Sequence, residues 1–272
     1  MRGMRIILAV FAALFLLHAS LVYAETAAPG SDRPARSGDG WQFSVTPYMW
    51  AVSVDSKVTI GNYSTSSTMT FSDIWNDLQI AGEIHLEARK GKFGFFLDPT
   101  YLKLQQDSTF TGTRNGATPP PVRDLTLAAD MWLVEFGAFY QVGKWSVGGN
   151  GRSLSVDVLG GGCYWYLHGS LDTSSLVNPT STNHFVDPIV GATLRADLTE
   201  KLMVYLRGDI GGFGVGSDFS WNGAALFGYR ITPAVTALLG YRMLYLDYKA
   251  GSSRARYDIT MQGPIGGIVF MF

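Results

Sequence analysis

The sequence predicts an all-β protein: a transmembrane antiparallel up-and-down β-barrel of about ten strands, with twelve or eight as alternatives. The first observation is alternation, because in residues 80–91 (IAGEIHLEARKG) apolar side chains oppose Glu83, His85 and Glu87 with a period of two. The second is composition. Only 16% of the 272 residues are charged, below the roughly 25% of soluble domains. Yet the longest apolar run, Ile6–Leu17, is shorter than the roughly 18–20 residues of a spanning helix. The third is the alternation of short turns with longer polar links, which is typical of outer-membrane barrels.

The N-terminus predicts export. Residues 1–24 read as a signal peptide, with Arg2 and Arg5 before the apolar run and a small-residue cleavage site ending at Ala24. Residues 25–40 are rich in Pro, Gly and Ser and have almost nothing to bury, which predicts a flexible periplasmic arm. Residues 41–272 are then the barrel, and the predicted location is the outer membrane of a Gram-negative cell.

Charge and cysteine content limit the function classes. Without the signal, which holds two basic residues and no acid, the chain keeps 19 basic and 22 acidic residues, so nothing suggests a nucleic-acid partner. Cys163 is the only cysteine, which excludes an internal disulfide and a thiol-rich metal site. We therefore expect no metal and no cofactor.

The ordered domain begins with residues 41–52, whose aromatic side chains suit a membrane interface. Residues 57–71 predict a short polar hairpin turning near Gly61 and Asn62, and residues 72–78 a helical turn capped by Ser72 or Asp73. If that hairpin also crossed the membrane, the strand count would rise to twelve.

From residue 78 the pattern is regular, and we expect tight turns at residues 90–92, 143–144, 199–201 and 231–233. The longer links, at residues 107–124, 172–183, 215–218 and 250–256, are expected on the outside. The remaining spanning strands are predicted at residues 78–90, 93–106, 125–142, 145–167, 185–198, 202–212, 219–229, 235–248 and 257–272.

The alternation also predicts which side chains face the lumen. A charge facing lipid near the midplane costs about 2–4 kcal/mol, so the ionic faces point inward and must be paired there. The alternation loses its phase near Pro99, Asp130 and Asp247, where it predicts bulges. The predicted lumen ionic network comprises Glu83, His85, Glu87, Arg89, Glu135, Asp187, Arg195, Arg207, Asp209 and Arg242.

Several motifs resemble a group of proteobacterial outer-membrane β-barrel proteins. The most specific is the run from Arg207 to Trp221 (RGDIGGFGVGSDFSW). Others are residues 47–50 (PYMW), 71–74 (FSDI), 187–188 (DP) with Gly191, 240–242 (GYR) with residues 247–248 (DY), and the final Phe272. Members are mostly described as outer-membrane or porin-like proteins without an agreed substrate, so the resemblance implies fold and location only. The sequence departs from the family pattern at Cys163, where relatives often have Arg.

The last strand carries the predicted assembly signal. Phe272 follows Phe270 and Ile268 at intervals of two, and it resembles the terminal signature read by the outer-membrane assembly machinery. That machinery and outer-membrane lipid are the expected partners; the sequence does not predict an oligomeric state.

Residues with potential for chemistry have simpler structural interpretations. His85 between Glu83 and Glu87 suggests acid/base or metal chemistry, but barrel interiors commonly hold such residues in structural networks. A lipid or peptide hydrolase at the outer rim would need His168 or His184 with a serine such as Ser170 or Ser174 and with Asp187, and no nucleophile motif encloses those serines. Residues 208–216 (GDIGGFGVG) lack the βαβ context of a phosphate loop and predict strand curvature and a tight turn.

The expected function is therefore that of an integral outer-membrane barrel with a structural or narrow porin-like transport role. The alternatives are an outer-membrane hydrolase and a surface-exposed interaction or adhesion protein that acts through residues 107–124 and 172–183. No catalytic, metal-binding or cofactor-binding residues are assigned.

Overall fold

A computed structural model describes residues 40–60, 63–110, 123–147, 152–173, 180–249 and 255–272. The expected signal peptide and arm lie outside the described residues. Residues from Trp41 onward form one compact unit. Its elements are β1 (Gln42–Trp50), β2 (Ser53–Ile60), β3 (Tyr63–Met69), α2 (Phe71–Asp77), β4 (Leu78–Lys90), β5 (Phe93–Phe110), β6 (Arg123–Ser146), β7 (Ser153–Thr173), β8 (Thr180–Asp197), β9 (Leu202–Gly211), β10 (Phe219–Thr232), β11 (Val235–Lys249) and β12 (Ala255–Met271).

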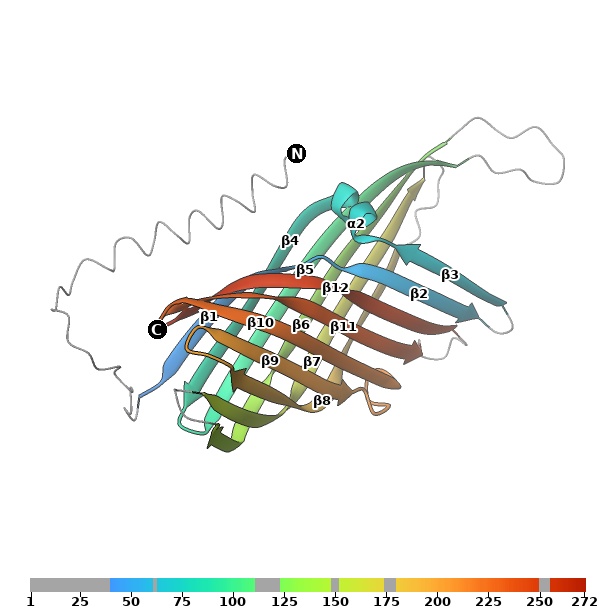
Figure 1. The fold of residues 1–272 in the computed structure, drawn as a ribbon. Helices are drawn as coiled ribbons and strands as arrows, with labels where there is room; N and C mark the ends of the chain where they lie inside the picture. Colours follow the sequence, from blue (N-terminus) through green and yellow to red (C-terminus); the bar gives the residue numbers. More distant parts are fainter. Residues whose placement is uncertain (1–39, 61–62, 111–122, 148–151, 174–179, 250–254) are drawn as a thin grey trace. The chain divides into compact units, whose positions relative to one another are not determined.

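Ten of these strands close into an antiparallel barrel (Figure 1). The order is β1-β4-β5-β6-β7-β8-β9-β10-β11-β12, and β1 pairs with β12 to close the ring. The prediction of an all-β barrel of about ten strands is confirmed. Within the described part of the chain, no helix is long and apolar enough to cross a bilayer.

The barrel has two distinct ends. The short connections, such as Gly91-Lys92 and Pro233-Ala234, and both ends of the barrel chain lie at one end, which we call the turn end. The longer connections leave from the other end, which we call the loop end. Strands β5 to β8 have 18 to 24 residues, about twice the roughly 9–11 that a membrane crossing would need.

The expected hairpin after the first strand is present and continues the wall of the barrel. β1 breaks at Ala51, and β2 then runs on beside the upper half of β12. β3 returns along β2 and leads into α2. The cap of α2 is Thr70, not Ser72 or Asp73, because the Thr70 side chain accepts from the Asp73 N–H while the Asp73 carboxylate accepts from the Thr70 N–H at 2.9 Å.

Two local predictions are wrong. β6 does not turn at Gly143-Lys144; a register shift there lets it continue to Ser146, and a Cβ on Gly143 would overlap the Trp145 ring. No register shift occurs at Pro99, Asp130 or Asp247, although the pairing of β4 with β5 is interrupted at Asp98 and Pro99. Asp130 and Asp247 instead face outward on the projecting walls, where Lys103 lies 3.9 Å from Asp130 and Arg256 pairs with Asp247.

The glycine-rich segment after β9 forms the tight turn that the sequence predicts. Gly212, Phe213 and Gly214 all have positive φ, which is the conformation that favours glycine. Asp187 fixes this turn by accepting from the Ser217 N–H at 2.6 Å and from its hydroxyl at 2.7 Å.

Candidate functional site

The outer face of the barrel is apolar from the turn end upward. Phe93, Phe227 and Leu239 are each more than 60% exposed, and they alternate with inward-facing side chains on their strands. A soluble protein rarely leaves so many large apolar side chains exposed on one continuous face. The exposed large apolar or aromatic residues of this belt include Trp41, Phe43, Phe95, Leu97, Phe136, Tyr140, Val142, Trp145, Val158, Val190, Leu202, Leu206, Ile210, Tyr229, Ile231 and Tyr241.

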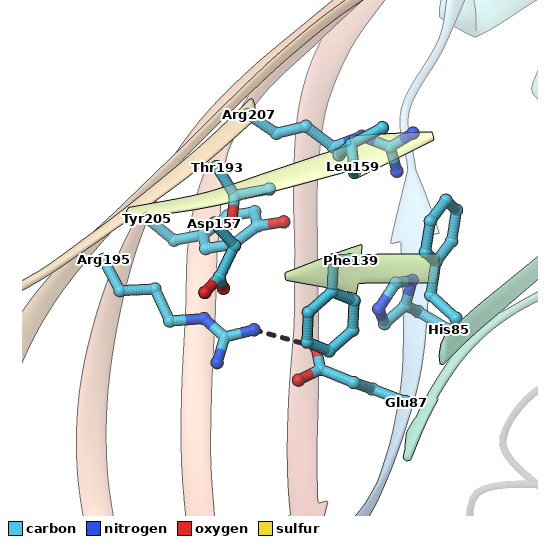
Figure 2. A pocket seen from close by; sticks show the side chains of 10 residues that line it. His85, Glu87, Phe139, Asp157, Leu159, Thr193, Arg195, Tyr205 and Arg207 are labelled. Carbon is cyan, nitrogen blue, oxygen red and sulfur yellow. Dashed lines mark hydrogen bonds and ion pairs between the residues drawn. The ribbon is translucent and has the colours of Figure 1, made fainter. Parts of the chain in front are cut away.

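Near the turn end, ion pairs cross the lumen between strands that are not neighbours in the sheet. Arg89 on β4 contacts Asp157 on β7 at 2.7 Å and Glu87 at 3.3 Å. Arg195 on β8 reaches across to Glu87 at 2.8 Å, as Figure 2 shows. Both arginine side chains are thus held by carboxylates of other strands.

A second layer of ion pairs lies at mid-height. Glu135 on β6 accepts from Arg242 on β11 at 2.8 Å and lies 2.9 Å from Arg207 on β9. Arg207 also contacts Asp209 at 2.8 Å, and Asn222 bonds to both Asp209 and Arg242. Glu135 is therefore the common partner of Arg207 and Arg242, which lie three and five strands away around the ring, and the side chains of all these groups are buried.

The same layer extends to β1 and β4. Asp98 accepts from the Tyr48 hydroxyl at 2.6 Å and lies 2.9 Å from His85 Nδ1. Glu83 accepts from the Trp50 backbone N–H at 2.6 Å. His85 is thus held by an aspartate and not by the flanking Glu83 and Glu87. Among the described residues, no group of three His, Cys, Asp or Glu side chains could hold a metal ion.

The structure brings most of the sequence-predicted network residues together and adds several partners. Asp187 stands apart, since it holds the β9–β10 turn. Asp98, Asp157, Tyr48 and Asn222 were missed. Asp157 could have been predicted, because it has the same inward phase on β7 as Leu159 and Cys163. Asp98 was not predicted to face the lumen because a bulge was expected at the neighbouring Pro99.

Above the ion pairs the lumen is apolar. Trp165, Leu133 and Leu246 are at most 2% exposed and belong to one continuous cluster. Ile74 of α2 is buried in it too. Cys163 lies at its floor, opposite Glu135 and Asp187 in the strand register, so an arginine at this position would stand beside two buried carboxylates. The upper cluster further includes Trp50, Val52, Leu244 and Met261, with Val54, Met69, Leu102, Leu104, Met131, Phe185, Tyr248 and Ile259 packed against it.

One small cavity is bordered by the ionic layers. Its lining includes His85, Glu87, Arg195, Tyr205 and Arg207 (Figure 2). Its volume of about 20 Å³ accommodates one or two water molecules, since one water needs at least about 10–15 Å³. It is too small for a nutrient-sized solute.

Of the residues considered for hydrolysis, the described side chains of His168, His184 and Asp187 are not assembled into a site. His168 contacts Thr182 at 2.7 Å and lies on the outward face of β7. His184 is exposed on the outward face of β8, whereas Asp187 points inward. Ser174 lies outside the described residues.

Comparison with known proteins adds little about family. No family model and no curated protein matches the sequence. The solved structures that resemble it include the outer membrane protease OmpT from Escherichia coli, at 8% identity and a TM-score of 0.49, covering 86% of this chain and 97% of that one. Neisserial surface protein A matches at 15% identity and a TM-score of 0.30, covering 85% and 97%. The toluene transporter TodX from P. putida matches at 12% identity and a TM-score of 0.28, covering 87% and 91%. The assignment of the fold therefore rests on the strand pairing itself, and the family resemblance stays a prediction.

Proposed function

We propose that this chain is an integral outer-membrane β-barrel whose axial path is closed by the two layers of ion pairs, so that it does not act as an open diffusion pore. The observation that carries this proposal is the set of contacts across the lumen: Arg195 to Glu87, Arg89 to Asp157, and Arg242 to Glu135. These pairs join strands that lie four, three and five places apart around the ten-strand ring, so each crosses part of the lumen.

Membrane insertion is supported by the apolar belt and by the closed ring. Backbone groups in hydrocarbon have no water to bond, so only helices and closed barrels satisfy them there. The strand pairing supplies these bonds around the turn end, and the C-terminal strand completes the ring, with Phe272 and Phe43 exchanging backbone hydrogen bonds. Recognition of Phe272 by the assembly machinery belongs to the same proposal.

Closure of the lumen follows from the cost of separating buried ions. Removing one partner of a buried ion pair costs about 3–5 kcal/mol, because the other charge is left unpaired. Ions and polar solutes would have to break several such pairs to pass. A structural or tightly gated role therefore fits the lumen better than general diffusion.

Planar-bilayer recording tests this proposal. The purified wild-type protein is expected to give no stable conductance steps, and E87A/R195A, which removes both partners of one cross-lumen pair, is expected to give small steps. K249A, which alters an ion pair outside the lumen, is the matched control and should stay silent. Stable open steps in the wild-type protein would show that water and ions pass the ionic layers, and would overturn the proposal.

A further inference from the structure

The wall of the barrel is not equally tall on all sides. β9 has 10 residues, whereas its neighbour β8 has 18. Their last pair joins Ile189 to Gly211, and β8 continues beyond this pair to Thr180. The turn from β9 to β10 therefore lies lower on the barrel than the far end of β8, and Figure 1 draws it where these two strands end.

This turn is held in one conformation by hydrogen bonds to β8 and within itself. The Gly212 N–H donates to the Pro188 carbonyl at 3.2 Å, and the Val215 N–H donates to the Gly212 carbonyl at 2.9 Å. Ser217 is buried against Asp187, which accepts from its N–H and its hydroxyl. A fixed turn loses little conformational freedom when it binds a partner.

The fixed turn presents two large apolar side chains to its surroundings. Residues 212, 214 and 216 are glycines, so Phe213 and Val215 are the only side chains of residues 212–216. Phe213 is 53% exposed and Val215 is 73% exposed. Among the described residues, Phe213 is also the only non-glycine residue with a positive φ, at 51°, a conformation that persists only where the surrounding structure imposes it. We call Phe213 and Val215 the apolar tip.

The apolar tip continues the apolar belt of the barrel. Ile210 and Phe219 stand at the base of the turn on β9 and β10, and both are more than 40% exposed. No charged residue interrupts the segment from Ile210 to Ser217. The exposed apolar surface therefore runs without a break from the outer face of these strands onto the turn.

The height of the tip indicates which part of a membrane it would meet. The belt on β9 begins at Leu202, directly after Glu200 and Lys201, so its lower edge lies there. Ten residues of a strand tilted by about 40° rise roughly 25 Å, which is the height of the apolar band in membrane barrels. The tip follows at the upper edge of that band.

We propose that the apolar tip is a lipid anchor, which inserts Phe213 and Val215 among the acyl chains just below the headgroups of the outer leaflet. The anchor rests on the membrane insertion proposed above. Lipid is the occupant because the tip lies at the edge of the band and is continuous with the belt, whose partner is acyl chains. Aromatic side chains are enriched at this depth in membrane proteins.

Spin labels at single cysteines test the anchor. Phe213→Cys, Val215→Cys, Leu206→Cys and Lys249→Cys are each made together with Cys163→Ser, labelled with a nitroxide and folded into phosphatidylcholine vesicles. Collision rates are measured with oxygen, which concentrates in the bilayer, and with a water-soluble nickel chelate. Leu206 is the control within the belt, and Lys249, exposed at the loop end of β11, is the control in water.

The anchor predicts a several-fold higher ratio of oxygen to nickel collisions at positions 213 and 215 than at position 249. The ratio should stay below that at position 206, because the tip lies near the headgroups. If positions 213 and 215 resemble position 249 while position 206 lies in lipid, the tip is left for a protein partner outside the membrane and the anchor is overturned. If position 206 is also in water, membrane insertion itself fails.

Methyl NMR tests the native side chain without a label. The protein with ¹³C-methyl valine is placed in lipid nanodiscs, and Val215→Ala assigns the Val215 signals by their loss. Lipids that carry a nitroxide near the headgroup should broaden the Val215 methyl signals more strongly than those of Val52, which is buried in the upper lumen. Broadening of Val215 by a water-soluble gadolinium chelate, with no effect of the labelled lipid, would overturn the anchor.

Discussion

The two halves of the lumen solve the same packing problem with opposite chemistry. In the lower half, Arg89, Arg195 and Arg207 pair with carboxylates of strands three or four places away around the ring. Above them, Leu133, Trp165 and Leu246 pack as in the core of a soluble protein. The ionic half carries the apolar belt on its outer face and the upper half continues beyond this belt, so the lower half is polar inside and apolar outside.

This difference shows that the two kinds of interior stabilise the barrel in different ways. Ion pairs across the lumen are directional and fix the distance between opposite walls, while apolar packing tolerates rearrangement at lower cost. The ionic half is therefore suited to hold the barrel rigid.

Arg242→Met should give the largest effect. It leaves Glu135 without one of its two arginines and removes the bond to Asn222 and the stack on Trp50. We expect a loss of about 3–5 kcal/mol in the free energy of unfolding, measured by urea titration in vesicles with tryptophan fluorescence. Lys249→Met, which breaks an exposed pair with Asp218, should cost less than about 1 kcal/mol. Equal losses of stability in the two variants would show that the buried ion pair of the lumen contributes no more to the free energy of unfolding than the exposed pair does.

Leu246→Ala tests the apolar half. The side chain is fully buried, and its truncation should cost about 3 kcal/mol in the same titration. We expect this variant, like the wild type, to give no conductance steps in planar bilayers, because the ion pairs below Leu246 are unchanged. Conductance in this variant would show that the apolar half, and not the ionic half, closes the lumen.

Thr70→Val should give the smallest effect, confined to α2. The Thr70 hydroxyl caps the helix, and substitution of such a cap costs about 1 kcal/mol of helix stability. Hydrogen bonds from Thr70 also lower the pKa of Asp73, so the stability gained from the cap is present at neutral pH and is lost as the pH falls below about 4. Hydrogen exchange of α2 should quicken in this variant at pH 7, with little change in β6 or β7. Quicker exchange throughout the barrel would contradict a local role.

Much of the barrel could be predicted from the sequence because a period of two is a local property. The alternation along residues 80–90, the low charge content and the short turns were enough to predict the closed sheet and its strand number. The choice of which face points inward followed from the cost of a charge in lipid, which applies to each strand separately. The hairpin after the first strand was predictable for the same reason.

The partners across the lumen were decided by the tertiary structure alone. Nothing local to Glu135 indicates that it joins Arg207 and Arg242, because those residues are brought near it by the stagger of ten strands. The bulges predicted near Asp130 and Asp247 were wrong because these charges face outward on the long walls at the loop end, where Lys103 and Arg256 pair with them. At Pro99 the neighbouring Asp98 keeps its inward phase without a bulge. The division of the lumen into an ionic and an apolar half likewise depends on strand register, which is set by contacts between segments distant in the chain.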